Sequence, residues 1–215
     1  MTKSENFDII FLRHGESIGN LERRWQGQAD YPLTETGSEQ ARALGNRWLA
    51  EGRRFDHILA SPQKRAKETA DIIAGILNLT VKTDPIWMER NIGDVAGMTN
   101  EEVNQRFPTR NNVTPFVPIV GDDGEGDWEL YLRAGRALHG LLNRKPGRYL
   151  VVSHGGFLNQ IMHAVVGITP QAGYSGPRFR FGNTGFAHLT YRPHSHQWQI
   201  NSLNDRSHWN GKDTD

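Results

Sequence analysis

The stretch Phe7–Glu16 reads FDIIFLRHGE, an apolar run that ends in a basic and polar corner. A short run of β-branched and aromatic residues of this kind predicts a buried strand. A second stretch, Arg148–Gly156, reads RYLVVSHGG and repeats the order of apolar residues, histidine and glycine. In open α/β sheets, ligands bind just beyond the carboxyl ends of the strands. We therefore expect the two His-Gly corners to lie together in one site.

Strands and helices are predicted to alternate along the rest of the chain. Short apolar runs predict strands, and apolar residues at helical spacing predict helices. We expect strands at 7–12, 57–60, 79–83, 148–152, 186–191 and 198–203, and helices over about 34–49, 66–77, 128–148 and 157–166. The first helix is capped either by Thr34 or by Thr36, which would form a capping box with Glu39. The alternation predicts an α/β fold in three layers, with a mostly parallel central sheet and helices on both faces.

Composition narrows the classes of protein that the chain can belong to. A length of 215 residues suits a single domain over 1–215. The balance of 25 Lys and Arg against 24 Asp and Glu gives no electrostatic signature of nucleic-acid or anionic-membrane binding. Because the chain has no cysteine, disulfides, thiol catalysis and cysteine-ligated metals are excluded. We find no apolar leader and no membrane-spanning stretch, so we expect a soluble cytoplasmic protein.

The segment 107–127 interrupts the periodic pattern. Its prolines, together with several Asn, Gly and Asp residues, predict irregular chain. A loop of this length within a compact domain is usually a lid, a binding loop or a disordered segment. Four late histidines, His188, His194, His196 and His208, have a spacing that fits no tight ligand set, so no metal is expected.

Five local motifs follow one another along the chain. They are RHGES at 13–17 with Asn20; Gln26-Gly27 followed by PLTETG at 32–37 and Gln40-Ala41; Ser61-Pro62 with Arg65-Ala66 and Thr69-Ala70; Glu89 with Gly93-Asp94 and Gly97; and SHGG at 153–156. Together they resemble the histidine phosphatase superfamily, the group that includes cofactor-dependent phosphoglycerate mutases. The resemblance covers the chain from Ile9 to about His208.

An imidazole beside guanidinium groups suits phosphoryl transfer. To attack phosphorus, His14 must be neutral with one ring nitrogen held by a backbone acceptor, and nearby cations favour that form. The planar forks of Arg13 and Arg65 match phosphate oxygens, and His154 can donate a hydrogen bond to one of them. If these cations suffice, the transfer needs no metal. The resemblance implies that His14 forms a phosphohistidine and that Arg13, Arg65 and His154 complete the phosphate pocket.

The resemblance also implies a proton donor and a set of contacts around the phosphate. Glu89 has the position of the donor, and a protonated carboxyl beside a poor leaving group accelerates its departure by roughly a hundred- to ten-thousandfold. Asn20 and Gln26 either hydrogen-bond the phosphate or substrate, or fix the loop that carries them. Gly27 belongs to the same expected set, and Gly155 is expected to let the backbone approach the ligand closely. Taken singly, each of these residues could instead be structural.

The run after Glu89 separates two activities within the family. The mutase pattern has histidine and tyrosine in place of Asn91-Ile92, and asparagine and lysine in place of Thr99-Asn100. The lost groups would hold a carboxylate and a second phosphate. Gly93-Asp94 looks more like the broad-specificity phosphatase branch. The resemblance therefore favours a phosphomonoesterase that hydrolyses a small phosphorylated metabolite without a cofactor.

Two alternatives stay open from the sequence. A cofactor-dependent phosphoglycerate mutase would require 2,3-bisphosphoglycerate, and an inert member would bind a phosphorylated ligand or a partner without turnover. The segment 107–127 and residues 178–180 are expected to frame the substrate mouth, and one sequence does not define the shape of such segments. The sequence therefore names neither the substrate nor the oligomeric state. Beyond a small phosphorylated substrate, no nucleic-acid or membrane partner is expected.

Overall fold

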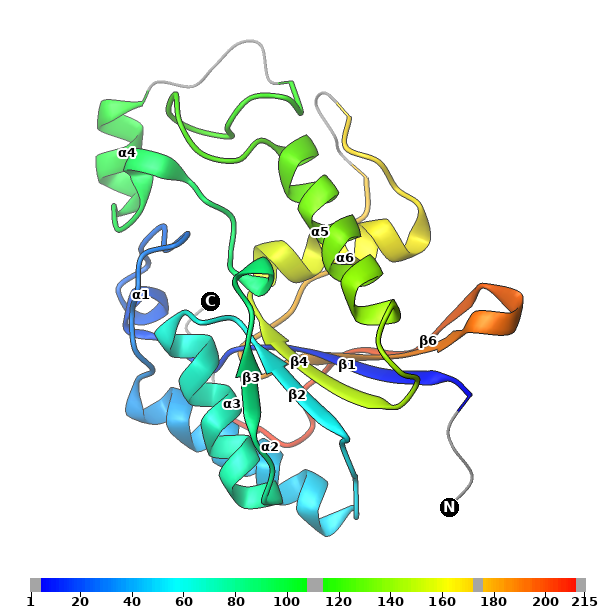
Figure 1. Ribbon diagram of the computed structural model, residues 1–215. Coiled ribbons are helices and arrows are strands. Elements are labelled where there is room, and N and C mark those ends of the chain that lie inside the picture. Colours follow the sequence, from blue (N-terminus) through cyan, green and yellow to red (C-terminus); the bar gives the residue numbers. More distant parts are fainter. Residues whose placement is uncertain (1–4, 108–113, 172–175, 212–215) are drawn as a thin grey trace.

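A six-stranded sheet runs through the middle of the molecule in the computed structural model, which describes residues 5–107, 114–171 and 176–211 (Figure 1). The strands are β1 (Phe7–Arg13), β2 (His57–Ala60), β3 (Val81–Thr83), β4 (Arg148–Ser153), β5 (Phe186–Arg192) and β6 (Gln197–Asp205). They lie in the order β3-β2-β4-β1-β5-β6. The pairs among β3, β2, β4 and β1 are parallel, whereas β5 pairs antiparallel with both β1 and β6. The prediction of a mostly parallel sheet is confirmed.

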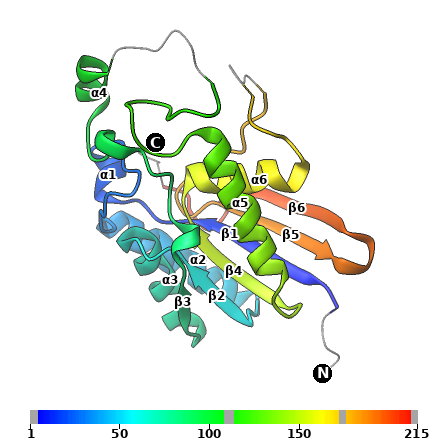
Figure 2. The same ribbon diagram turned by 45° about the horizontal axis from the view of Figure 1, so that its top comes forward.

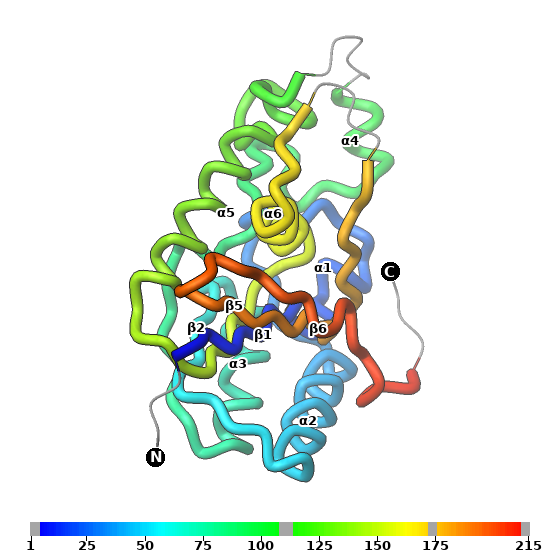
Figure 3. Tube along the Cα trace, turned by 90° about the vertical axis from the view of Figure 1, so that its right-hand side faces the viewer, coloured from blue at the N-terminus to red at the C-terminus, as the bar shows by residue number. Residues whose placement is uncertain are grey.

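Helices cover both faces of this sheet, as Figures 2 and 3 show. The helices α2 (Glu35–Ala50) and α3 (Lys64–Leu77) pack on one face, and α5 (Asp127–Leu142) and α6 (Gly155–Val166) pack on the other. This is the predicted three-layer α/β arrangement. Among the residues that the structure describes, no helix is both long and apolar enough to cross a membrane.

The side chains on the two faces of β1 belong to two separate hydrophobic clusters. Because successive residues of a strand point to opposite faces, Ile10 and Leu12 join α2 and α3, while Ile9 and Phe11 join α5 and α6. All four side chains have no exposed surface. Burial of each contributes about 1.5–3 kcal/mol to folding, so β1 and the corner that follows it are firmly held.

Several boundaries differ from the sequence prediction. The strand β3 begins at Val81 because the backbone N–H of Leu79 bonds to Ala74 O and closes the end of α3. The helix α5 ends at Leu142 because Pro146 follows and cannot continue it. Two further helices, α1 (Ile18–Leu21) and α4 (Asn100–Arg106), are not predicted, since each is shorter than two helical turns.

The start of α2 and the irregular segment follow the prediction. Thr34 is the N-cap of α2, and its hydroxyl accepts a hydrogen bond from Gly37 N at 3.0 Å. Of the predicted segment 107–127, the described residues 107 and 114–126 form no helix or strand, whereas Asp127 is already the first residue of α5. Residues 108–113, which the prediction also included, lie outside the described residues.

The sheet brings the two His-Gly corners together. β1 and β4 are parallel neighbours in which Arg13 pairs with Ser153. One residue further on, the backbone N–H of His14 donates to Ser153 O at 3.0 Å. His14 and His154 therefore leave adjacent strands at the same edge of the sheet, which is the predicted juxtaposition.

Two glycines allow the loop after β1 to cross the N-terminus of α2. A Cβ on Gly15 would lie 2.5 Å from Gly37 O, and a Cβ on Gly37 would lie 2.0 Å from Glu16 O. Both distances are far shorter than a real Cβ contact, so the two backbones can touch only without side chains at these positions. This contact fixes the path of the chain directly beyond His14.

Candidate active site

His14 and His154 form the centre of the candidate site. Their ring centroids are 5.2 Å apart, and the two residues are 3% and 0% exposed, respectively. Each follows the last residue of a strand, and His154 is also the N-cap of α6. The sheet and one helix therefore hold the pair rigidly.

The imidazole of His14 is held as a neutral base. Its Nδ1 lies 2.7 Å from Gly15 O, so Nδ1 carries the proton and Nε2 carries the lone pair. Burial, followed by the charges of Arg65 and Arg13, lowers the pKa of His14 well below its usual value, against the opposing effect of the Gly15 carbonyl. A neutral ring that is held by the backbone through Nδ1, with the lone pair on Nε2, has the form that a nitrogen nucleophile requires.

Two arginines supply positive charge beside this ring. Arg65 is 1% exposed and donates to Gly27 O and Ala29 O, both at 2.8 Å. Burial lowers the pKa of Arg65 to about 10, so the side chain stays charged at neutral pH. Arg13 is half-buried and donates from Nη1 to Phe181 O at 2.8 Å. The two guanidinium groups attract anions to the His14 side of the site.

His154 has no hydrogen bond on either ring nitrogen within the described part of the chain. Burial, and then the charges of Arg65, His14 and Arg13, lower the pKa of His154 well below its usual value. An imidazole that is buried, neutral and unpaired is costly, and unsatisfied groups of this kind concentrate at functional sites. The ring is ready to donate to an incoming oxygen atom.

Glu89 faces the N-terminus of α6. Its carboxylate accepts from Gly156 N at 3.0 Å and from Arg90 N at 2.8 Å. A Cβ on Gly156 would lie 2.8 Å from Glu89 Oε1, so a side chain at this position would force the carboxylate to shift. Gly156 is not among the predicted site residues, although the second glycine of SHGG is a visible signal. The structure thus brings Glu89 against the helix that follows His154.

The remaining predicted residues make contacts within the protein. Asn20 Oδ1 and Gln26 Oε1 each lie 2.8 Å from Ser17 Oγ, and this polar cluster holds the loop after β1. Gly27 has a φ of +46°, and its carbonyl accepts from Arg65. A Cβ on Gly155 would make only an ordinary contact, 3.5 Å from Arg13 Cδ. Contact of these four residues with a ligand stays a prediction.

Two side chains outside the prediction hold the segment that carries Glu89. Gln63, which is 4% exposed, donates from Nε2 to Gly27 O and accepts from Glu89 N at 2.8 Å. It therefore links the loop bound by Arg65 to the backbone of Glu89. No local sequence pattern reveals this role, because it depends on three separate loops meeting.

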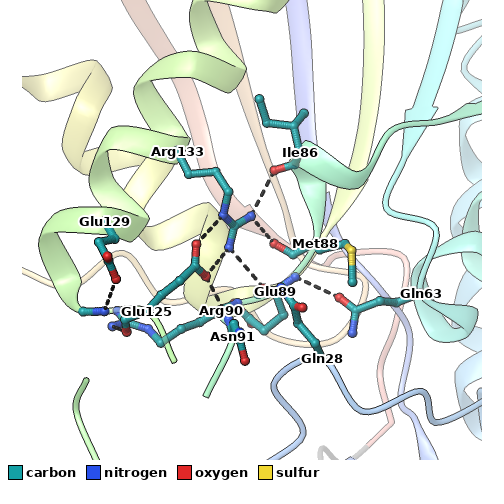
Figure 4. A network of polar contacts seen from close by, with 11 residues as sticks. Gln28, Gln63, Ile86, Met88, Glu89, Arg90, Asn91, Glu125, Glu129 and Arg133 are labelled. Carbon is teal, nitrogen blue, oxygen red and sulfur yellow. Dashed lines mark hydrogen bonds and ion pairs between the residues drawn. The ribbon is translucent and has the colours of Figure 1, made fainter. Parts of the chain in front are cut away.

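The second side chain that holds the segment carrying Glu89 is Arg133 of α5, which lies at the centre of the network in Figure 4. It forms a two-pronged ion pair with Glu125, with both N–O distances at 2.7 Å. The same guanidinium donates to the carbonyls of Ile86, Met88 and Glu89. One half-buried cation therefore connects α5, the irregular segment and the backbone at Ile86, Met88 and Glu89.

A cavity of about 780 Å³ opens beside this network. Gly156, whose N–H binds the Glu89 carboxylate, is part of its wall. The described wall also includes Arg90 and residues of the irregular segment, of α6, of 169–171 and of 178–180. Among the described residues, no group of three or more His, Cys, Asp or Glu side chains could hold a metal ion.

Comparison with known families places the chain in a class. The family model of the histidine phosphatase superfamily (branch 1) matches residues 9–206, and the chain belongs to this superfamily. It is an enzyme of the phosphoglycerate mutase-like type. The chain is 32% identical over 210 residues to the "Probable phosphoglycerate mutase GpmB" of Yersinia enterocolitica, which covers 93% of this chain and 94% of the relative.

Solved structures show the same fold. Bacillus stearothermophilus YhfR superimposes with a TM-score of 0.80 at 29% identity, covering 94% of this chain and 98% of the other. The phosphoserine phosphatase of Entamoeba histolytica, solved in complex with 3-phosphoglyceric acid, has a TM-score of 0.77 at 26% identity, with coverages of 94% and 98%. The family and the fold thus agree with the resemblance drawn from the sequence.

Proposed function

We propose that the protein is a phosphomonoesterase that hydrolyses a small phosphorylated metabolite through a phosphohistidine on His14. The observation that carries the proposal is the neutral His14 ring, held through Nδ1 by Gly15 O, beside Arg65, Arg13 and a His154 ring that has no hydrogen bond among the described residues. This group can bind a phosphoryl dianion and present a nucleophile to it.

The reaction proceeds in two displacements. In the first, the Nε2 lone pair of His14 attacks phosphorus while the bond from phosphorus to the ester oxygen breaks, and Glu89 transfers its proton to that oxygen. In the second, water attacks the phosphohistidine, Glu89 takes the proton from the water, and phosphate leaves the neutral His14.

Contacts in the run 91–100 favour hydrolysis over mutase chemistry. Thr99 caps α4 by accepting from Glu102 N, and Asn100 Oδ1 accepts from Trp25 Nε1 at 2.6 Å. The positions at which the mutase pattern has asparagine and lysine are therefore engaged in the fold. The second candidate remains a phosphoglycerate mutase, because the curated relatives carry that name.

The test is a release assay with p-nitrophenyl phosphate, a panel of metabolite monophosphates, and 3-phosphoglycerate with and without 2,3-bisphosphoglycerate. We expect phosphate release that falls by roughly four to six orders of magnitude in His14→Ala. His194→Ala, which changes an exposed histidine, is the matched control. Isomerisation of 3-phosphoglycerate only in the presence of the bisphosphate, without phosphate release, would support the mutase instead.

A further inference from the structure

The cavity of about 780 Å³ adjoins the candidate site at Gly156. Its wall includes Gly156, which holds the carboxylate of Glu89, the proposed proton donor to the leaving oxygen. If each of its non-hydrogen atoms is given the ~30 Å³ that one molecule occupies in liquid water, glycerate fills only roughly 200 Å³. The cavity therefore has room for an alcohol well beyond three carbons, within the range usual for small-molecule sites.

Positive charge is concentrated on one part of the cavity wall. Arg90 is paired with Asp127 at 2.5 Å, so these two charges compensate each other. Arg178 and Arg180 also line the cavity, and neither has a carboxylate partner among the described residues. Among the described residues, the wall thus presents two guanidinium groups whose positive charge no carboxylate neutralises. Neither group is one of the residues proposed to bind the phosphate.

Two polar residues of α6 hold the segment that carries these arginines. Asn159 Oδ1 accepts from Phe179 N at 2.8 Å, and His163 Nε2 donates to Pro177 O at 3.0 Å. The rings of His163 and Phe179 also pack edge to face, with centroids 5.5 Å apart. Because backbone bonds lie on either side of Arg178, its position against the cavity is set before any ligand arrives.

A third polar residue of α6, Gln160, also lines the cavity. Gly156, Asn159, Gln160 and His163 follow the i, i+3, i+4, i+7 spacing of one helix face, and all four line the cavity. Gln160 is only 6% exposed, and its Oε1 is buried with no partner in the described part of the chain. A buried carboxamide oxygen without a hydrogen bond costs stability, and its presence in a ligand-sized cavity points to a polar ligand.

We infer that this cavity binds the alcohol half of the substrate, that this half carries a second anionic group against Arg178 and Arg180, and that Gln160 hydrogen-bonds a polar group of the same alcohol. The anionic group is a carboxylate or a second phosphate, since both suit guanidinium groups. The inference rests on the proposed function, because it takes the monoester phosphate to lie at His14.

The test uses pairs of phosphomonoesters that differ in the second anion. Phosphoserine and phosphoethanolamine differ by a carboxylate, and fructose 1,6-bisphosphate and fructose 1-phosphate differ by a phosphate. We expect kcat/KM to favour the anionic member of one pair by about tenfold or more, and the pair concerned identifies the anion. In the double variant Arg178→Gln/Arg180→Gln, that ratio falls toward one, whereas Arg54→Gln, at the opposite edge of the sheet, retains it.

The inference is overturned if the wild-type protein does not discriminate within either pair, or if the double variant discriminates equally well. Failure of the proposed function gives a different result, namely no release of phosphate from p-nitrophenyl phosphate. To distinguish failure of this inference from failure of the proposed function, the dissociation constants of both substrate pairs are also measured calorimetrically. These measurements use the His14→Ala protein, with and without the arginine substitutions. The expected preference and its loss apply to binding as they do to turnover.

Gln160→Met separates ligand binding from a structural role. Methionine has a similar length and no polar atoms, so it removes the unpaired oxygen without leaving a large cavity. We expect an unchanged or higher Tm and a KM for the preferred substrate that rises about tenfold. A lower Tm with an unchanged KM would show that Gln160 is structural and would remove it from the inference.

Discussion

The two ends of the candidate site are built in different ways. The phosphate end consists of strand ends and helix starts: His14 and His154 follow β1 and β4, and Arg65 lies in the first turn of α3. The other end, around the cavity, is built from the irregular segment and residues 178–180, held by side-chain bonds to α5 and α6. The sheet positions the residues that we propose act on the phosphate, whereas the loops form the cavity that we propose binds the rest of the substrate.

The largest effect should come from the phosphate end. Arg65→Met removes a buried cation, and we expect kcat/KM for any monoester to fall by roughly 10³- to 10⁵-fold, the range for an arginine that stabilises a transferring phosphoryl group. Circular dichroism and Tm would confirm that the variant folds. A folded variant with activity within tenfold of wild type would show that the phosphate end is not where we place it.

Glu89 lies where the two ends meet, so its loss should depend on the leaving group. Glu89→Gln should lower kcat by roughly 10²- to 10⁴-fold for alkyl phosphates, which need a proton on the leaving oxygen. The loss should be much smaller for p-nitrophenyl phosphate, because nitrophenolate leaves without one. Equal losses for both kinds of ester, measured side by side, would remove the proton-donor role.

Neighbouring glycines offer a sharper comparison at the start of α6. Gly156→Ala places a Cβ 2.8 Å from Glu89 Oε1, whereas Gly155→Ala makes only an ordinary contact at 3.5 Å. Displacement of a reacting group by about 1 Å can cost about 100-fold. We expect Gly156→Ala to lower kcat for alkyl phosphates by up to that factor and Gly155→Ala to lower it less. The reverse order would contradict the assigned geometry.

Arg133 should act on the reaction only through the position of Glu89. Arg133→Met removes the ion pair to Glu125 and three bonds to backbone carbonyls. We expect a fall in kcat of about tenfold for alkyl phosphates, little change for p-nitrophenyl phosphate, and a lower Tm. Arg136→Met, on the exposed side of the same helix, is the control. A loss of the same size for both esters would indicate a general disturbance instead.

The smallest expected effect is a dependence of the free energy of unfolding on pH, which the two buried histidines of the phosphate end cause. In the folded protein, the pKa values of His14 and His154 are lowered well below 6.5. Just below pH 6.5 these two histidines therefore bind protons in the unfolded chain but stay neutral in the folded protein. The free energy of unfolding should therefore fall from pH 7 to pH 5, by about 1.4 kcal/mol per pH unit for each such proton. Denaturant titration should give a shallower fall for His154→Gln than for the exposed control His194→Gln. Equal slopes would contradict the buried neutral imidazole.

The comparison also explains how far the sequence could predict the molecule. The corners after β1 and β4 are local patterns in which an apolar run is followed by polar residues, so both histidines could be placed at one edge of the sheet. The helix α4 was missed because it is short, although Thr99 and Glu102 form a capping box that the sequence displays.

The contacts of Arg133 and Gln63 could not be predicted in the same way. Each joins segments that are far apart in the sequence, such as Gln63 with Gly27 and Glu89, and such contacts exist only once the sheet has brought the loops together. Neither the spacing nor the composition of the chain reveals them. What the sequence conveys is the part of the site that local structure builds.

The most direct test of the central claim is the stereochemistry at phosphorus. A monoester made chiral at phosphorus by oxygen isotopes is hydrolysed, and the configuration of the released phosphate is compared with that of the ester. Two in-line displacements, the first by His14 and the second by water, predict overall retention. Inversion would mean that water attacks the ester directly, and it would contradict a phosphohistidine on His14.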